Sequence, residues 1–294
     1  MKFRTEIKIT DAPENLTPER LVLLMGSCFS DNIGARMEQA GWPVEANPCG
    51  TVYNPVSIAV LMRLAMIHRP MRREIVASSL TDREGKYVSW FMGSKAGGAT
   101  EEECVDAVCE CIDRLEDAIE RAQAMVVTFG TADIWLLAGT DRAVGNCHKH
   151  PATEFDKKRA SVEEITALWK ETVEAVRMRN PEMKIIFTVS PRRYLGEGTA
   201  ATFADNTRMK AVLLLACEAL CKEIKDAWYF PAYEILNDDL RDYRFYASDM
   251  LHPSTQAVEY IWEKYCEMFL DKEAREKLKE LEKEEKRKRH IQKL

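Results

Sequence analysis

Long apolar runs are missing from this sequence. No stretch approaches the roughly 18 consecutive apolar residues that a membrane-spanning helix needs. The first residues, 1–16, contain no apolar segment followed by a small-residue cleavage site, which a secretory signal peptide would have. We therefore expect no membrane span and no signal peptide, and the cytoplasm is the expected location.

An excess of basic residues is also missing. Lys and Arg number 42 against 48 Asp and Glu, and the resulting net charge of −6 is spread along the chain. Proteins that bind nucleic acids usually carry a basic face or stripe. The charge pattern therefore predicts no nucleic acid partner.

Paired cysteine motifs are the third absence. The chain has nine cysteines, an odd number, and no two of them form the CxxC pair of structural zinc sites. This spacing predicts free thiols in a reducing compartment rather than a disulfide framework. We expect neither a metal nor a cofactor.

Short apolar runs alternate with longer amphipathic patterns over most of the chain. The apolar runs occupy residues 21–25, 42–48, 124–130, 184–190 and 227–233. The helical patterns occupy about residues 30–40, 55–68, 101–122, 161–179, 205–225 and 254–270. Strands that alternate with helices predict an α/β fold, in which a parallel sheet has helices on both faces.

Two segments depart from this alternation. Residues 78–94 contain two β-like stretches around a turn at Arg83-Glu84-Gly85-Lys86, which predicts an inserted hairpin. Residues 271–294 are nearly all charged and predict a solvated helix or a frayed tail. We therefore expect one domain over residues 1–270, followed by a charged C-terminal helical extension over residues 271–294.

The corner after the first apolar run carries two adjacent side chains that can act as nucleophiles. Parallel sheets bind ligands beyond the carboxyl ends of their strands. Gly26 permits a sharp turn there, and Ser27 and Cys28 follow it at the start of a helical pattern. The free N–H groups of a helix start suit a developing oxyanion. Alternatively, Ser27 is only the N-cap of that helix.

A second polar group precedes the last helical pattern of the domain. Asp249 and His252 lie three residues apart in the stretch Ser248–Ser254. This spacing lets the carboxylate accept the Nδ1–H of the imidazole, and a histidine held in this way is the base that activates a serine. A turn aspartate and a capping histidine are the structural alternative. Together with Ser27, the pair predicts a Ser-His-Asp triad.

Polar or glycine residues follow the other apolar runs as well. The candidates for substrate binding are Gly130, Thr131, His148, Lys149, Arg192 and Arg193, and Gly50 offers a backbone N–H group. The cationic members suit an anionic substrate such as an acidic glycan, although arginines in such loops also form structural ion pairs. Asp133 is expected to cap a following turn, and Trp90, Trp135 and Tyr246 are candidate walls of a sugar cleft.

The chain resembles the SGNH/GDSL hydrolase superfamily and, within it, the GSCFA family. The resemblance covers about residues 20–270 and depends on Gly26-Ser27-Cys28-Phe29-Ser30 and Ser248–Ser254, with support from NPCGTVYNP, TFGTADIW, NCHK and TVSPRR. It implies a three-layer α/β/α flavodoxin-like fold with a mainly parallel five-stranded sheet. It also implies Ser27 as nucleophile, His252 as base and Asp249 as the residue that orients the base.

The resemblance further implies an oxyanion hole, and here the chain departs from the pattern. The backbone N–H groups of Ser27 and Gly50 match two of the three expected donors. The third is an asparagine in a GxND block, but Gly130-Thr131-Ala132-Asp133 has alanine at that position. Asn146 is the first candidate replacement and Asn54 the second. Losing one such donor typically lowers the rate about 10²–10³-fold.

We therefore expect a serine esterase that acts through an acyl-enzyme on a small-molecule or carbohydrate ester, such as an O-acetylated carbohydrate. An O-acyltransferase on the same scaffold is one alternative. A glycan-binding module without catalysis is the other, and the missing asparagine favours it.

Overall fold

A five-stranded parallel sheet forms the centre of the molecule. The computed structural model describes the chain except residues 1–3, 11, 13–14, 196–201 and 292–294. The strands run in the order β10-β9-β5-β1-β2, and every neighbouring pair is parallel. Their bounds are β1 Val22–Gly26, β2 Val44–Ala46, β5 Ala124–Phe129, β9 Lys184–Val189 and β10 Ala227–Phe230. In chain order the sheet reads 2-1-3-4-5, which is the flavodoxin-like arrangement.

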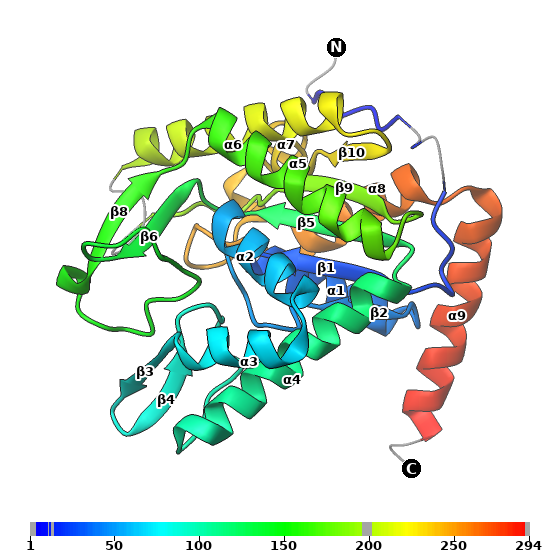
Figure 1. Cartoon of the computed structure of the whole chain (residues 1–294). Helices are drawn as coiled ribbons and strands as arrows, with labels where there is room; N and C mark the ends of the chain where they lie inside the picture. Colours follow the sequence, from blue (N-terminus) through cyan, green and yellow to red (C-terminus); the bar gives the residue numbers. More distant parts are fainter. Residues whose placement is uncertain (1–3, 11, 13–14, 196–201, 292–294) are drawn as a thin grey trace.

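Helices cover both faces of this sheet, which gives the expected three layers (Figure 1). Alternate residues of β1 point to opposite faces: Leu23 and Met25 join the larger apolar core, and Val22 and Leu24 join the smaller one. The larger core lies under α2 Pro55–Met66, α4 Glu101–Arg121, α5 Val162–Arg179 and α6 Phe203–Glu223. The smaller lies under α1 Cys28–Gln39 and α8 Thr255–Phe269.

The helix starts follow from local sequence signals. Thr100 accepts a hydrogen bond from the N–H of Glu103, whose side chain binds back to the N-cap N–H, and Ser161 and Glu164 do the same for α5. These capping boxes satisfy N–H groups that would otherwise lack partners. The six predicted helices are observed within one or two residues of their expected starts.

The predicted hairpin insertion is confirmed. Strands β3 Leu80–Arg83 and β4 Lys86–Ser89 pair antiparallel around the turn at Glu84-Gly85. Helix α3 Arg69–Ala77 precedes them and was not expected.

A second small sheet corrects one expectation. Strands β6 Asp133–Leu137, β7 Ala143–Val144 and β8 Phe155–Arg159 form an antiparallel sheet after β5. Asp133 therefore starts a strand and does not cap a turn; its carboxylate forms ion pairs with Lys157 and Arg159 across the β6–β8 pair. The remaining short elements are η1 Ala152–Glu154, α7 Ala232–Glu234, η2 Ile235–Leu240 and η3 Tyr243–Phe245.

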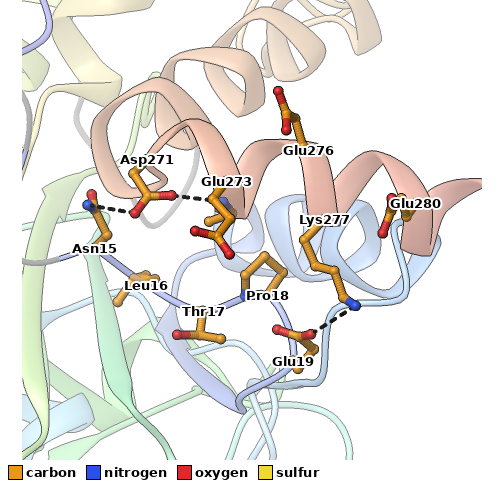
Figure 2. A pocket seen from close by; sticks show the side chains of 11 residues that line it. Asn15, Leu16, Thr17, Pro18, Glu19, Asp271, Glu273, Glu276, Lys277 and Glu280 are labelled. Atoms are coloured by element: carbon orange, nitrogen blue, oxygen red, sulfur yellow. Dashed lines mark hydrogen bonds and ion pairs between the residues drawn. The ribbon is translucent and has the colours of Figure 1, made fainter.

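The charged C-terminal segment forms helix α9 Lys272–Ile291, which packs on the body of the molecule. Leu278 is only 5 % exposed and belongs to the smaller core. Figure 2 shows α9 beside the N-terminal segment, where Asn15 binds Asp271 and Glu19 pairs with Lys277. Within the described residues, no helix is long and apolar enough to cross a membrane.

Candidate active site

The carboxyl ends of β1 and β5 meet where the strand order of the sheet reverses. Chain connections leave this point in opposite directions, so a crevice forms there in flavodoxin-like sheets. Ser27 directly follows β1, and Gly130 directly follows β5. The strand ends therefore bring two of the predicted site positions together.

The Ser27 corner is tightly built. Gly26 has φ of +130°, and a Cβ at this position would lie 2.2 Å from the carbonyl oxygen of Thr128. Only glycine fits such a corner. Ser27 is the N-cap of α1, its Oγ accepts from the N–H of Phe29 at 3.2 Å, and the residue is 0 % exposed.

A buried polar network that the sequence analysis missed holds this corner. The Oδ1 of Asn47 accepts the N–H of Gly26 at 2.8 Å, and its Nδ2 donates to Asp31 at 2.9 Å. The Oγ1 of Thr51 donates to the other oxygen of Asp31 at 2.9 Å. Asn47 directly follows β2 at a positive φ of 44°. The sequence does contain a signal for this network, because Asn47 is a polar residue at the carboxyl end of an expected parallel strand.

Asp249 and His252 form the predicted pair. The Nδ1 of His252 lies 2.5 Å from one carboxylate oxygen of Asp249, and the other oxygen accepts the N–H groups of Leu251 and His252. The hydrogen bond from the imidazole, followed by those two N–H groups, holds the pKa of Asp249 well below its usual range. An ionised carboxylate keeps the proton on Nδ1, so Nε2 is the free acceptor.

Helices α1 and α8 begin just after Ser27 and His252, at the same edge of the sheet. The two helices are in contact in the smaller core, and Arg36 forms an ion pair of 2.9 Å with Glu259. The N–H of Arg193, in the loop after β9, donates to the carbonyl of Leu251 and so fixes the histidine turn to the sheet edge. The His252 side chain is 37 % exposed. In the described part of the chain, no hydrogen bond joins Ser27 Oγ to His252 Nε2.

The predicted oxyanion donors have internal partners. The N–H of Ser27 donates to the carbonyl of Thr128 at 3.3 Å, and that of Gly50 donates to the carbonyl of Asn47 at 2.8 Å. Asn54 caps α2: its Oδ1 accepts the N–H of Ser57 and its Nδ2 donates to the Ser57 hydroxyl. A working oxyanion hole would therefore require the Ser27 and Gly50 N–H groups to exchange partners when substrate binds.

The loop with Asn146, His148 and Lys149 lies against the inserted hairpin. Asn146 accepts the N–H of His148, and the His148 ring binds the carbonyl of Ser89 at the end of β4. Burial of His148 lowers its pKa, and Lys149 is exposed. Among the described residues, none of the three side chains forms a hydrogen bond with Ser27 or His252.

Gly130 and Thr131 have structural partners as well. Their N–H groups both donate to the carbonyl of Tyr53, at 2.8 and 3.1 Å. The hydroxyl of Thr131 faces the sulfur of Met209 in α6. Neither the N–H groups of this loop nor the Thr131 hydroxyl is therefore free to bind substrate in this conformation.

Arg193 lines a groove beside the histidine turn. The groove has a volume of about 180 Å³ and is lined by Arg193, Leu236, Asn237, Arg241, Asp242, Tyr243 and Tyr246. The guanidinium lies 4.1 Å from the ring centre of Tyr246 and 5.4 Å from that of Tyr243. Trp90 and Trp135, the other candidate cleft walls, instead pack with Phe155 in a separate small cluster.

The environment of Cys28 does not favour a reactive thiolate. It is half-buried, and this burial raises the pKa of its thiol, although the positive charge of Arg192 acts in the opposite direction. A thiol with a raised pKa holds its proton at neutral pH. The local electrostatics therefore favour the neutral form at this position.

A family model and several solved structures match the chain. The model of the GSCFA family matches residues 21–265. No curated protein matches the chain.

Three solved structures are similar to the chain at low sequence identity. A family 3 carbohydrate esterase from Talaromyces cellulolyticus is 9% identical, with 84% of this chain and 94% of that one covered and a TM-score of 0.39. A family 3 carbohydrate esterase from Clostridium thermocellum is 9% identical, with 85% and 94% covered and a TM-score of 0.34. An acetyl xylan esterase from Butyrivibrio proteoclasticus is 10% identical, with 84% and 63% covered and a TM-score of 0.35.

Proposed function

The chain belongs to the GSCFA family, and from this premise we propose that it is a serine esterase with Ser27 as nucleophile, His252 as base and Asp249 as the orienting carboxylate. The observation that carries the proposal is the preformed Asp249–His252 pair at the sheet edge where Ser27 begins α1. A base held by a carboxylate is what a serine hydroxyl needs to react.

The reaction would proceed in two halves. Ser27 Oγ attacks the ester carbonyl while its proton passes to His252 Nε2, and the alcohol leaves with that proton as the C–O bond breaks. Water then attacks the acyl-enzyme with the same base and releases the acid. The ionised Asp249 stabilises the imidazolium in both halves.

We propose an O-acetylated carbohydrate as the substrate, bound in part by the groove of Arg193, Tyr243 and Tyr246. The groove adjoins the histidine turn: the N–H of Ala247 donates to the carbonyl of His252 at 2.8 Å, and Tyr246 pairs with Pro253. Aromatic faces next to polar groups suit sugar rings, which have both apolar and hydroxyl surfaces.

A non-catalytic glycan-binding module is the second candidate. The observation in its favour is that Ser27 is 0 % exposed and that its N–H is already used by Thr128. Such a module would retain glycan affinity and would not react with a fluorophosphonate probe.

The test is hydrolysis of p-nitrophenyl acetate and acetate release from acetylated oligosaccharides by Ser27→Ala. We expect kcat to fall by about 10⁴–10⁶-fold, because a triad works as a unit. Cys28→Ala is the matched control and should stay within about threefold of the unchanged chain. Equal rates for Ser27→Ala and the unchanged chain, or labelling by fluorophosphonate at another residue, would reject the proposal.

A further inference from the structure

Two basic side chains that form no ion pair within the described part of the chain lie near the Ser27 corner. Lys210 of α6 is buried, and its Nζ donates to the carbonyls of Gly130 at 2.8 Å and Ser190 at 2.7 Å, which follow β5 and β9. Arg192, in the loop after β9, is half-buried. Over the residues that the structure describes, neither forms an ion pair with a carboxylate.

Two basic groups this close to each other disfavour each other's charged forms. Burial, followed by the nearby charge of Arg192, pushes the pKa of Lys210 well below its usual value. A buried charge normally has a partner, since removing it from water is costly. The lowered pKa favours the neutral amine of Lys210, whereas the guanidinium of Arg192 keeps its positive charge.

Two polar atoms in the same place lack hydrogen bonds. Arg192 Nε and the hydroxyl of Tyr194 are buried, and neither meets an acceptor or donor with good geometry among the described residues. The Arg192 guanidinium lies 4.6 Å from the ring centre of Tyr194. Buried polar groups in native proteins are rarely left unpaired, so these atoms indicate a position that a ligand or water fills.

The position is next to the site of the proposed reaction. The Tyr194 hydroxyl lies against Gly130, where an added Cβ would be 2.3 Å away, and the Tyr194 ring contacts Tyr53 edge-on. Arg192 has the largest effect of any charged side chain on the thiol of Cys28, the residue after Ser27. The positive charge of Arg192 thus reaches Cys28, the residue beside Ser27.

We propose that Arg192 is a catalytic residue that stabilises the oxyanion formed when Ser27 attacks the ester carbonyl. The inference rests on the proposed function. In the step, the Oγ–C bond forms, the carbonyl π electrons move to the oxygen, and the Oγ proton passes to His252. Arg192 donates a hydrogen bond to this oxygen, which supplies the donor that Ala132 lacks. When the intermediate collapses, the C=O bond returns and the alcohol leaves with the His252 proton.

The alternative role for Arg192 is to bind an anionic group of the substrate. The two roles differ in what they change. An oxyanion donor acts in the transition state of every ester and lowers kcat when it is removed. A residue that binds a substrate anion changes KM for anionic esters and leaves neutral esters unaffected.

The experiment measures kcat and KM of Arg192→Gln with p-nitrophenyl acetate, which is a neutral ester. We expect kcat to fall by about 10²–10³-fold with KM within about threefold. Arg192→Lys should recover part of the loss because it keeps the charge. Arg208→Gln, an exposed arginine of α6 that pairs with Asp205, is the matched control and should leave both constants unchanged.

Three outcomes would overturn the inference. The first is an unchanged kcat in Arg192→Gln. The second is an increase in KM that is restricted to anionic esters. The third is an equal decrease in kcat in folded Arg192→Lys and Arg192→Gln. If circular dichroism shows that Arg192→Gln does not fold, kcat of Arg192→Lys is compared with that of the unchanged chain. A lower kcat at similar KM supports the inference, and an equal kcat rejects it. Loss of activity in Ser27→Ala with full activity in Arg192→Gln would reject this inference alone, whereas full activity in Ser27→Ala would reject the proposed function.

Discussion

Arg192 and Arg193 are neighbours in the chain but contact different parts of the molecule. Arg192 lies over Tyr194 and acts on the Ser27–Cys28 corner, whereas Arg193 lies over Tyr243 and Tyr246 in the groove beside the histidine turn. Under the proposals above, Arg192 would act at the acyl group and Arg193 would contact the sugar.

Tyr243 offers a test of the groove, because its side chain is 65 % exposed and replacing it should not disturb folding. For Tyr243→Ala we expect KM for an acetylated oligosaccharide to rise about threefold to tenfold, which corresponds to the loss of one aromatic contact. The kinetics of p-nitrophenyl acetate should not change. A similar KM increase for both substrates, or no increase for either, would contradict binding of the sugar in this groove.

The sequence allows some of these residues to be predicted and hides others. Ser27 stands out because it follows the apolar run 21–25 across a glycine, and Asp249 and His252 stand out because they come just before the helical pattern 254–270. Lys210 gives no such signal, since it lies inside a helical pattern where lysines are normally exposed. Lys210 is buried because its Nζ donates to the carbonyls of Gly130 and Ser190, which follow two strands far away in the sequence.

Strands are predictable from the sequence where their apolar residues are nearly continuous. Strands β1, β5 and β9 are buried on both faces and therefore read as unbroken apolar runs. Strand β8 has the sequence FDKKR with four exposed residues, and nothing in it indicates a strand apart from its pairing with β6. Helix α3 has only two buried residues, Arg72 and Val76, which is too few for a recognisable periodicity.

The β6–β8 pair is held by a buried carboxylate, and this leads to a pH prediction. Burial alone would raise the pKa of Asp133, but hydrogen bonds from Arg159 and Lys157 outweigh it and lower the pKa below 3.8. A lowered pKa in the folded chain stabilises the fold above the unfolded value and loses this effect as pH falls through the folded value. We expect Asp133→Asn to lower the free energy of unfolding by about 1–3 kcal/mol at pH 7.

The measurement is urea denaturation of Asp133→Asn and of the unchanged chain at several pH values. The difference in unfolding free energy should shrink below about pH 4. Asp141→Asn, an exposed aspartate of the β6–β7 turn, is the matched control and should change stability by less than about 0.5 kcal/mol. A loss that is the same at pH 7 and at pH 3 would show that the ion pairs do not stabilise the sheet.

At the scale of the whole molecule, the two ends of the chain stabilise each other. The N–H groups of Ala12 and Leu16 donate to the carbonyls of Met268 and Phe269 at the end of α8. Arg4 pairs with Asp239 in η2. Helix α9 then lies over this N-terminal segment (Figure 2).

The expected solvated tail is therefore part of the packed structure, which gives a stability prediction. Leu278→Ala should lower the free energy of unfolding by about 2 kcal/mol, because the residue is 5 % exposed and its removal leaves a cavity. Leu215→Ala is the matched control, since Leu215 is also helical but 53 % exposed, and should cost less than about 0.5 kcal/mol. Equal thermal stability of the two variants would place α9 outside the folded unit.

The contact between the first and last segments has a consequence for synthesis on the ribosome. The Ser27 corner emerges early, but α8, which follows the turn with Asp249 and His252, is among the last elements translated. The N-terminal segment also waits for α8 before its backbone finds partners, and such distant pairings form late. A chain whose translation stops before α8 lacks the helix that follows the Asp249–His252 turn and packs against α1, so under the proposed function we expect such a product to be inactive.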